Sequence, residues 1–194
     1  MNQHKKMTLT PILFFIVIQI LTIFLLIKAG RDRYEGIIVA TSLFIIYILL
    51  ELKYDLELNN YIRIILIITM LTDSTLGRYF NFYKTKPSFD ILLHIFGTYS
   101  FSLFAYSLIS QIFPNSYKSN CYRVIFVITL GIALGTIFEI IEFLFDILIN
   151  SSTKHQNGLI DTNLDLIADS FGAIIAALHL FLSNFNLVDT YKKK

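Results

Sequence analysis

The chain has 194 residues, of which 55% are hydrophobic and 15% are charged, and its mean hydropathy is +0.65. This composition excludes an ordinary soluble domain and favours a membrane protein. The net charge of +2 and the scattered Lys and Arg form no basic patch that would bind nucleic acid. The single cysteine, Cys121, excludes an internal disulfide and a multi-cysteine metal site. We interpret it as a packing thiol at a helix start.

A transmembrane helix needs about 20 predominantly apolar residues. Six stretches qualify, at residues 10–28, 36–53, 61–77, 88–113, 121–149 and 164–186. We interpret the first as a retained membrane helix, because its apolar run is too long for a signal peptide and Lys28 interrupts the position of a cleavage site. The predicted fold class is an all-α polytopic integral membrane helix bundle of about six helices, forming one transmembrane domain over residues 1–194.

Orientation in the membrane is weakly encoded. Nine of the 16 Lys and Arg residues fall on the side of the termini, and the other seven fall on the opposite side. Because cytoplasmic loops carry an excess of Lys and Arg, we expect a multi-pass protein of the plasma membrane with both termini in the cytoplasm.

Eight of the 14 acidic residues lie in or beside strongly apolar stretches. They are Asp73, Asp90, Glu139, Glu142, Asp146, Asp161, Asp165 and Asp169. A carboxylate at membrane depth is costly, and it is usually kept for a site, a relay or an ion. With six spans, all eight acids fall toward the face opposite the termini, whichever way the protein is inserted. This placement predicts one acidic site near that face.

In the fourth helix, Asp90 and His94 are four residues apart and share one helix face. A carboxylate beside an imidazole can bind a divalent cation, or the acid can orient the histidine as a base. The alternative is that Asp90 caps the helix and that His94 forms a hydrogen bond between helices.

The fifth helix carries Gly131 and Gly135, a spacing that lets another helix approach closely. Glu139 continues that stripe, and Glu142 and Asp146 follow on the same face. Paired glutamates are typical ligands in helix bundles. They can also form a protonated pair, because neighbouring carboxylates raise each other's pKa, or have a purely structural role.

The sixth helix repeats an acid every four residues, at Asp161, Asp165 and Asp169. Three like charges at this spacing repel, so a cation, a proton or a basic side chain must offset them. Asp161 also suits an N-cap. Oxygen ligands favour Mg, Ca or Mn, whereas the imidazole of His94 would allow Zn or Fe.

Other polar residues carry weaker signals. Arg78, Lys84 and Lys86 precede Asp90 among aromatic residues, and we interpret them as a solvated interfacial loop. The alternative is that they hold a phosphate or a lipid head group beside the acids. Lys154 and His155 are expected to be exposed, and His179 to pack between helices.

Three segments resemble the YjdF-like family of small bacterial membrane proteins, whose function is unknown. They are FDILLH (89–94), LGTIFEIIEF (134–143) and IDTNLD (160–165) followed by DSFGA. The resemblance covers roughly residues 70–185, and more distantly the chain is similar to VanZ-like proteins, which are linked to glycopeptide resistance. The positions that match the family's pattern are Asp90, His94, Glu139, Glu142, Asp161 and Asp165. The chain departs from the pattern at Phe143, where the family often has Trp, and at Gly158, where it often has Asp.

Three functions remain open. The first is a metal-dependent hydrolase or transferase that acts on a lipid-linked or phosphorylated substrate. Its candidate catalytic residues are His94, Glu139 and Glu142, and its candidate ligands for Mg, Mn, Ca or Zn are Asp90, His94, Glu139, Glu142, Asp161, Asp165 and Asp169. No organic cofactor is expected. The partners are the lipid bilayer and that substrate, with no nucleic acid, and the oligomeric state is open.

The second function is a proton- or cation-coupled transporter, and the third is a non-catalytic membrane partner protein. Solvent access and pairing distinguish the three. An enzyme site opens to one face, a carrier needs a route to both faces, and a structural network pairs each acid with a basic group.

Overall fold

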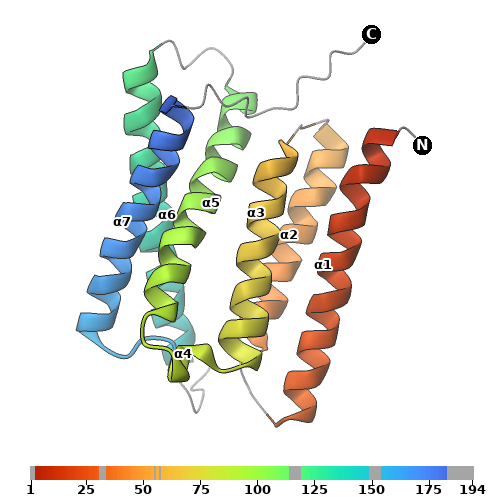
Figure 1. Ribbon diagram of the computed structural model, residues 1–194, viewed down its shortest axis with the longest axis vertical. Coiled ribbons are helices and arrows are strands. Elements are labelled where there is room, and N and C mark those ends of the chain that lie inside the picture. The colour runs from red at the N-terminus through yellow and green to blue at the C-terminus, as the bar shows by residue number, and fades with distance from the viewer. Residues whose placement is uncertain are drawn as a thin grey trace.

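The structure, a computed structural model, describes residues 3–30, 34–54, 56, 58–113, 119–148 and 154–182. These residues form helices and their connections, with no strand among them (Figure 1). In chain order they are α1 (Gln3–Lys28), α2 (Glu35–Tyr54), α3 (Asn60–Leu71), the π-helix η1 (Thr72–Tyr79), α4 (Phe82–Thr85), α5 (Phe89–Ile112), α6 (Asn120–Leu148) and α7 (Leu159–Leu182). The predicted all-α class is confirmed.

Among the described residues, five helices are long and apolar enough to cross a membrane. Their candidate spans are Leu9–Lys28, Glu35–Tyr54, Phe89–Ile112, Asn120–Leu148 and Leu159–Leu182. Large apolar side chains such as Phe14, Leu49 and Ile140 point outward and are exposed. A helix surface of this kind is stable against lipid and not against water. The molecule is therefore a polytopic helical membrane bundle.

The third expected span has a different form. In its place are the 12-residue α3 and the eight-residue η1, which ends two residues beyond the expected end. Together they contain Arg63, Asp73 and Arg78. The hydroxyls of Ser74 and Thr75 both donate to the carbonyl of Leu71, where the helix widens. Side-chain donation to a helix carbonyl competes with the regular backbone ladder, and π-turns frequently mark functional regions.

The last helix begins five residues earlier than expected, at Leu159. Gly158 before it has φ of +110°, a conformation that side-chain-bearing residues rarely adopt. Asp161 therefore lies inside the first turn, and the alternative in which it is the N-cap is wrong. It accepts hydrogen bonds from the backbone and side-chain nitrogens of Asn157. Residues 183–186, expected at the end of this span, lie outside the described residues.

The helices form two groups (Figure 1). α1, α2 and α3 lie on one side, α5, α6 and α7 pack against one another on the other side, and α3 contacts α5. α1 begins and α7 ends at one end of the bundle, while α4 lies at the opposite end. The core between the groups is apolar and aromatic. Tyr47 of α2 and Phe104 of α5, for example, meet edge to face with ring centroids 4.7 Å apart.

Small residues bring α5, α6 and α7 close together. A Cβ at Gly131 would meet Ser102 and Ala173, and a Cβ at Gly135 would meet the carboxyl group of Asp169. Gly172 lies in the same way against the backbone of Ile95. The predicted close approach at Gly131 and Gly135 is confirmed, and it brings α7 within reach of the polar residues of α5.

Candidate cation site

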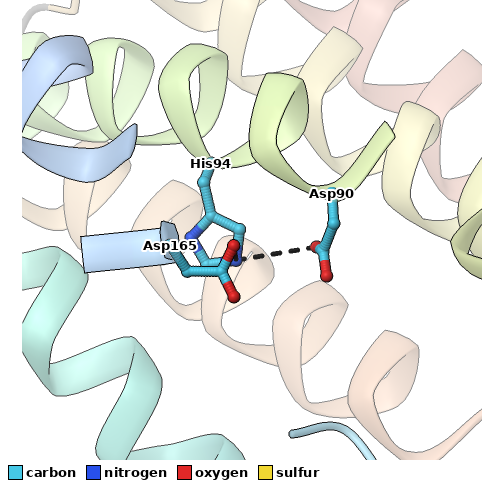
Figure 2. A group of neighbouring side chains, drawn as sticks. All are labelled: Asp90, His94 and Asp165. Atoms are coloured by element: carbon cyan, nitrogen blue, oxygen red, sulfur yellow. Dashed lines mark ion pairs between the residues drawn. The ribbon is translucent and has the colours of Figure 1, made fainter. Parts of the chain in front are cut away.

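His94 lies at the centre of the acidic cluster. Its Nε2 is 3.7 Å from Oδ1 of Asp90, 3.8 Å from Oε1 of Glu139 and 3.9 Å from Oδ1 of Asp165. Asp90 and His94 project from α5 and Asp165 projects from α7 toward them (Figure 2), while Glu139 comes from α6. The structure therefore brings together acids from three helices at one imidazole nitrogen. We call these four residues and Asp169 the His94 cluster.

The other side of the imidazole faces Asp169. Nδ1 of His94 is 3.2 Å from Oδ1 of Asp169, and the Thr98 hydroxyl donates to the same oxygen. A carboxylate at Nδ1 favours the tautomer with its proton there, which directs the Nε2 lone pair toward the other acids. The Phe138 ring packs edge to face against the imidazole, with ring centroids 5.8 Å apart, and restricts its rotation. Asp169 therefore contacts the Nδ1 side of the imidazole, whereas the other acids lie on its Nε2 side.

Two carboxylate oxygens of the cluster are buried and have no hydrogen-bond partner among the described residues. They are Oε1 of Glu139 and Oδ2 of Asp169, on side chains whose residues are 4% and 2% exposed. An unpaired buried carboxylate oxygen is costly and calls for a cation, a proton or a water. Oε1 of Glu139 faces Nε2 of His94, so a cation, proton or water bound to this oxygen would lie inside the cluster.

The cluster has the dimensions of a metal site. Ligand atoms of Asp90, His94 and Asp165 all lie within 4.8 Å of one another. Two atoms bound to one ion at about 2.0–2.2 Å lie at most about 4.4 Å apart. The 3.7–3.9 Å separations from Nε2 fall within that limit. Asp90, His94 and Asp165 could therefore hold a metal ion.

Charge in the cluster is unbalanced. For Glu139, Asp165 and Asp169, the one basic side chain within ion-pair distance in the described part of the chain is His94. Several carboxylates thus share one imidazole. Bound protons or a cation must supply the missing positive charge.

Three of the expected site residues lie around the cluster. Glu142 is half-buried, one turn beyond Glu139 on α6, and Asp161 is half-buried one turn before Asp165 on α7. Asp146 accepts hydrogen bonds from the backbone nitrogens of His155 and Gln156. The His94 cluster therefore contains Asp90, Glu139, Asp165 and Asp169, and Glu142 and Asp161 extend it toward the end of the bundle.

Asp73 and Arg78 form a separate pair, in which Arg78 is buried and Asp73 is half-buried. Nε of Arg78 is 3.0 Å from Oδ2 of Asp73, and the Tyr83 hydroxyl donates to Oδ1 of Asp73 at 2.5 Å. Burial raises the pKa of Tyr83 and the charge of Asp73 raises it further, so the phenol stays protonated as a donor. Arg78 also packs on Gly36, where a Cβ would lie 3.0 Å from Nη1. The interpretation of Arg78 as part of a solvated loop is wrong, because its spacing of five from Asp73 suits the π-helix.

Other polar residues also differ from expectation. His155 is bonded through Nδ1 to Asp146 at 2.9 Å and is not an exposed loop residue. Cys121 is exposed at the start of α6 and is not packed. His179 packs between helices, where its Nδ1 lies 2.6 Å from the Tyr99 hydroxyl.

Two residues of the site had not been identified from the sequence. Thr98 holds Asp169, and Gln156 donates through Nε2 to Oε2 of Glu139 at 2.9 Å. The position of Thr98, four residues after His94 on the same face, was an available signal. Gln156 lies in a loop, where no periodicity identifies it.

Comparison with known proteins agrees with this architecture. Residues 10–184 match the family described as "Predicted membrane protein (DUF2238)", which is the YjdF-like family that the three segments resemble. An "Uncharacterized protein" of Thermotoga maritima is 31% identical over 126 residues, and the chain spans 62% of that relative's length. No solved structure matches the chain. The distant VanZ-like resemblance stays a prediction. The match extends over most of the chain, and the protein therefore belongs to this family of predicted membrane proteins.

Proposed function

We propose that the protein binds a divalent cation between α5, α6 and α7. The ligands are His94 Nε2 and carboxylate oxygens of Asp90, Asp165 and Glu139. The observation that carries this proposal is the convergence of these oxygens, at 3.7–3.9 Å, on one imidazole nitrogen. Imidazole suits Zn and carboxylate suits Mn, Mg and Ca, so the mixed donor set favours Zn or Mn.

Asp169 has a different role in this proposal. It holds Nδ1 of His94 and is itself held by Thr98, the arrangement by which a carboxylate orients a metal-binding histidine. Asp169 is therefore a positioning residue, and Asp161 is an outlying acid that adds negative charge near the site.

The reaction proposed for the site is hydrolysis or transfer on a lipid-linked or phosphorylated substrate. A bound cation would neutralise phosphate charge and activate water. Glu142 is half-buried beside Glu139 and is the candidate general base once His94 and Glu139 are ligands. Lys84 and Lys86 are exposed in the segment that precedes Asp90. These cations favour an anionic substrate at this face.

Two observations favour this proposal over the alternatives. A carrier needs a route to the other face, and Gly131, Ser102 and Ala173 pack closely on the far side of the cluster from α4. A structural network would pair its acids with basic side chains, as Asp73 is paired with Arg78. We also propose that the cluster faces away from the cytoplasm, from the distribution of Lys and Arg.

The test is metal content and thermal stabilisation by Mn²⁺, Zn²⁺, Mg²⁺ and Ca²⁺ of the purified protein. We expect stoichiometric metal and a raised melting temperature, both lost in Asp90→Asn/Glu139→Gln. Glu35→Gln is the matched control, because it neutralises an acid in the first turn of α2, outside the cluster. Absence of metal, or an equal response in the double variant, would refute the cation site, and proton-coupled transport would then be tested.

Activity is tested in a second step. Metal-loaded protein is assayed for phosphate release from phosphorylated lipids, and Glu139→Gln should abolish turnover while the folded protein remains in the membrane. Unchanged turnover in Glu139→Gln would contradict the assignment of this site.

A further inference from the structure

The loop before α7 folds back onto the acidic half of α6. Nε2 of Gln156 donates two hydrogen bonds to one residue of α6, at 2.9 Å to Oε2 of Glu139 and at 3.0 Å to its backbone carbonyl. The single amide group therefore spans the side chain and the main chain of Glu139. This geometry restricts the direction in which the carboxylate points.

A second contact holds the loop in place. The carboxylate of Asp146 accepts from the backbone nitrogen of His155 at 2.7 Å and from that of Gln156 at 3.0 Å. It also bonds Nδ1 of His155 at 2.9 Å. Asp146 lies two helical turns after Glu139, so both residues lie on the same side of α6 and hold the loop at two points.

The consequence is found at the other oxygen of Glu139. Oε2 accepts a hydrogen bond from Gln156, whereas Oε1 has no hydrogen-bond partner among the described residues and lies 3.8 Å from Nε2 of His94. We propose that Gln156 is a positioning residue of the cation site, which holds Oε1 of Glu139 toward Nε2 of His94. Asp146 acts through Gln156 by holding the loop.

The chemistry of the amide suits this role. A neutral amide stabilises the ionised carboxylate by a charge-assisted hydrogen bond and leaves its negative charge available to a cation. A lysine at the same place would compensate that charge, and a glutamate would repel it. Partners that orient metal ligands typically change affinity by about 10- to 100-fold when they are removed.

The inference rests on the proposed cation site, and its test separates the two. Mn²⁺ affinity is measured by titration calorimetry on full-length wild-type, Gln156→Ala, Asp146→Asn and Gln111→Ala proteins, with melting temperatures in EDTA. Gln111 is the matched control, because its amide donates to the Ser107 carbonyl on α5, away from the cluster. We expect Gln156→Ala to weaken Mn²⁺ binding by about 10- to 100-fold. Gln111→Ala should bind as wild type does.

The positioning role predicts a further pattern. Asp146→Asn should also weaken Mn²⁺ binding. The double variant Gln156→Ala/Asp146→Asn should bind Mn²⁺ as well as Gln156→Ala does, because both changes remove the same contact of Gln156 with Glu139. A merely structural role would lower the melting temperature in EDTA and leave the affinity of the folded protein unchanged.

Each outcome is decisive. Wild-type affinity in folded Gln156→Ala would overturn the positioning role and leave the cation site intact. Absence of Mn²⁺ binding by the wild type would overturn both. If Gln156→Ala does not fold, wild-type affinity in Asp146→Asn overturns the proposal, and weakened binding supports it.

Discussion

Two groups of acids in this bundle have different partners. Glu51 and Asp73 each lie against one arginine, Arg63 and Arg78 respectively. In the described part of the chain, Glu139, Asp165 and Asp169 of the His94 cluster share one imidazole. One-to-one pairs need no further charge and stabilise the packing of neighbouring segments. An excess of carboxylates needs a cation or protons, which makes the His94 cluster the functional candidate of the two.

The largest effect is expected at the paired acids. Arg63→Met removes the cation opposite Glu51 and leaves a carboxylate that is only 13% exposed. Breaking a buried pair in this way typically costs about 3–5 kcal/mol of unfolding free energy. Unfolding in a detergent titration measures it. Arg63→Met/Glu51→Met should recover most of the loss, and a double variant as unstable as the single would show that Arg63 acts through packing.

A smaller effect is expected at the contact between α6 and α7. Gly135→Ala places a Cβ 2.5 Å from Cγ of Asp169, so the carboxyl group must move and release the His94 ring. We expect a loss of about 1–3 kcal/mol of unfolding free energy, typical of overpacking, together with weaker cation binding.

Gly97→Ala is its control, because a Cβ there meets only Cγ2 of Thr69 at an ordinary 3.7 Å. It should leave the unfolding free energy unchanged or raise it by about 0.5–1 kcal/mol, the usual gain of Ala over Gly in a helix. Equal losses in the two variants would argue against a special contact at Gly135.

Neutralising an acid should raise the unfolding free energy inside the His94 cluster, whereas it should lower it at a one-to-one pair. Asp165→Asn removes one of several like charges, so in EDTA it should raise the unfolding free energy by about 0.2–0.5 kcal/mol or more. It should also abolish stabilisation by Mn²⁺. Asp73→Asn, which leaves Arg78 without its partner carboxylate, should lower stability under the same conditions. Destabilisation by both variants would erase the distinction between the two groups.

The smallest effect is expected at Cys121. The thiol is exposed at the start of α6, so Cys121→Ser should change the unfolding free energy by less than about 0.5 kcal/mol. The same detergent titration measures this. A larger loss would mean that the thiol is buried in an assembly of the protein.

Much of the fold could be predicted from the chain. Apolar runs of the required length predict the helices, because a lipid-exposed segment must satisfy its own backbone hydrogen bonds. The third span was the least predictable, since Asp73 and Arg78 at a spacing of five belong to the π-helix and not to an α-helix. Likewise, φ of Gly158 determines where α7 begins.

The sequence predicted which residues form the candidate site better than it predicted the role of each residue. The four-residue spacings of Asp90 and His94 and of Asp165 and Asp169 place each pair on one helix face. The spacing of residues along the chain does not tell which ring nitrogen of His94, Nε2 or Nδ1, a given acid contacts. In the structure Asp165 lies at Nε2 and Asp169 at Nδ1.

The sequence by itself determined the membrane class, the positions of most helices, the end of the bundle that carries the acids, and the small residues that allow close packing. These properties follow from hydrophobicity and from the 3.6-residue period, which act within one helix. Only the tertiary structure decided that Arg78 pairs with Asp73, that Asp169 lies behind the imidazole and that Gln156 reaches Glu139. Such contacts depend on the rotation and depth of one helix against another and on the path of a loop. The packing of side chains between helices, and not the periodicity within one helix, determines this arrangement.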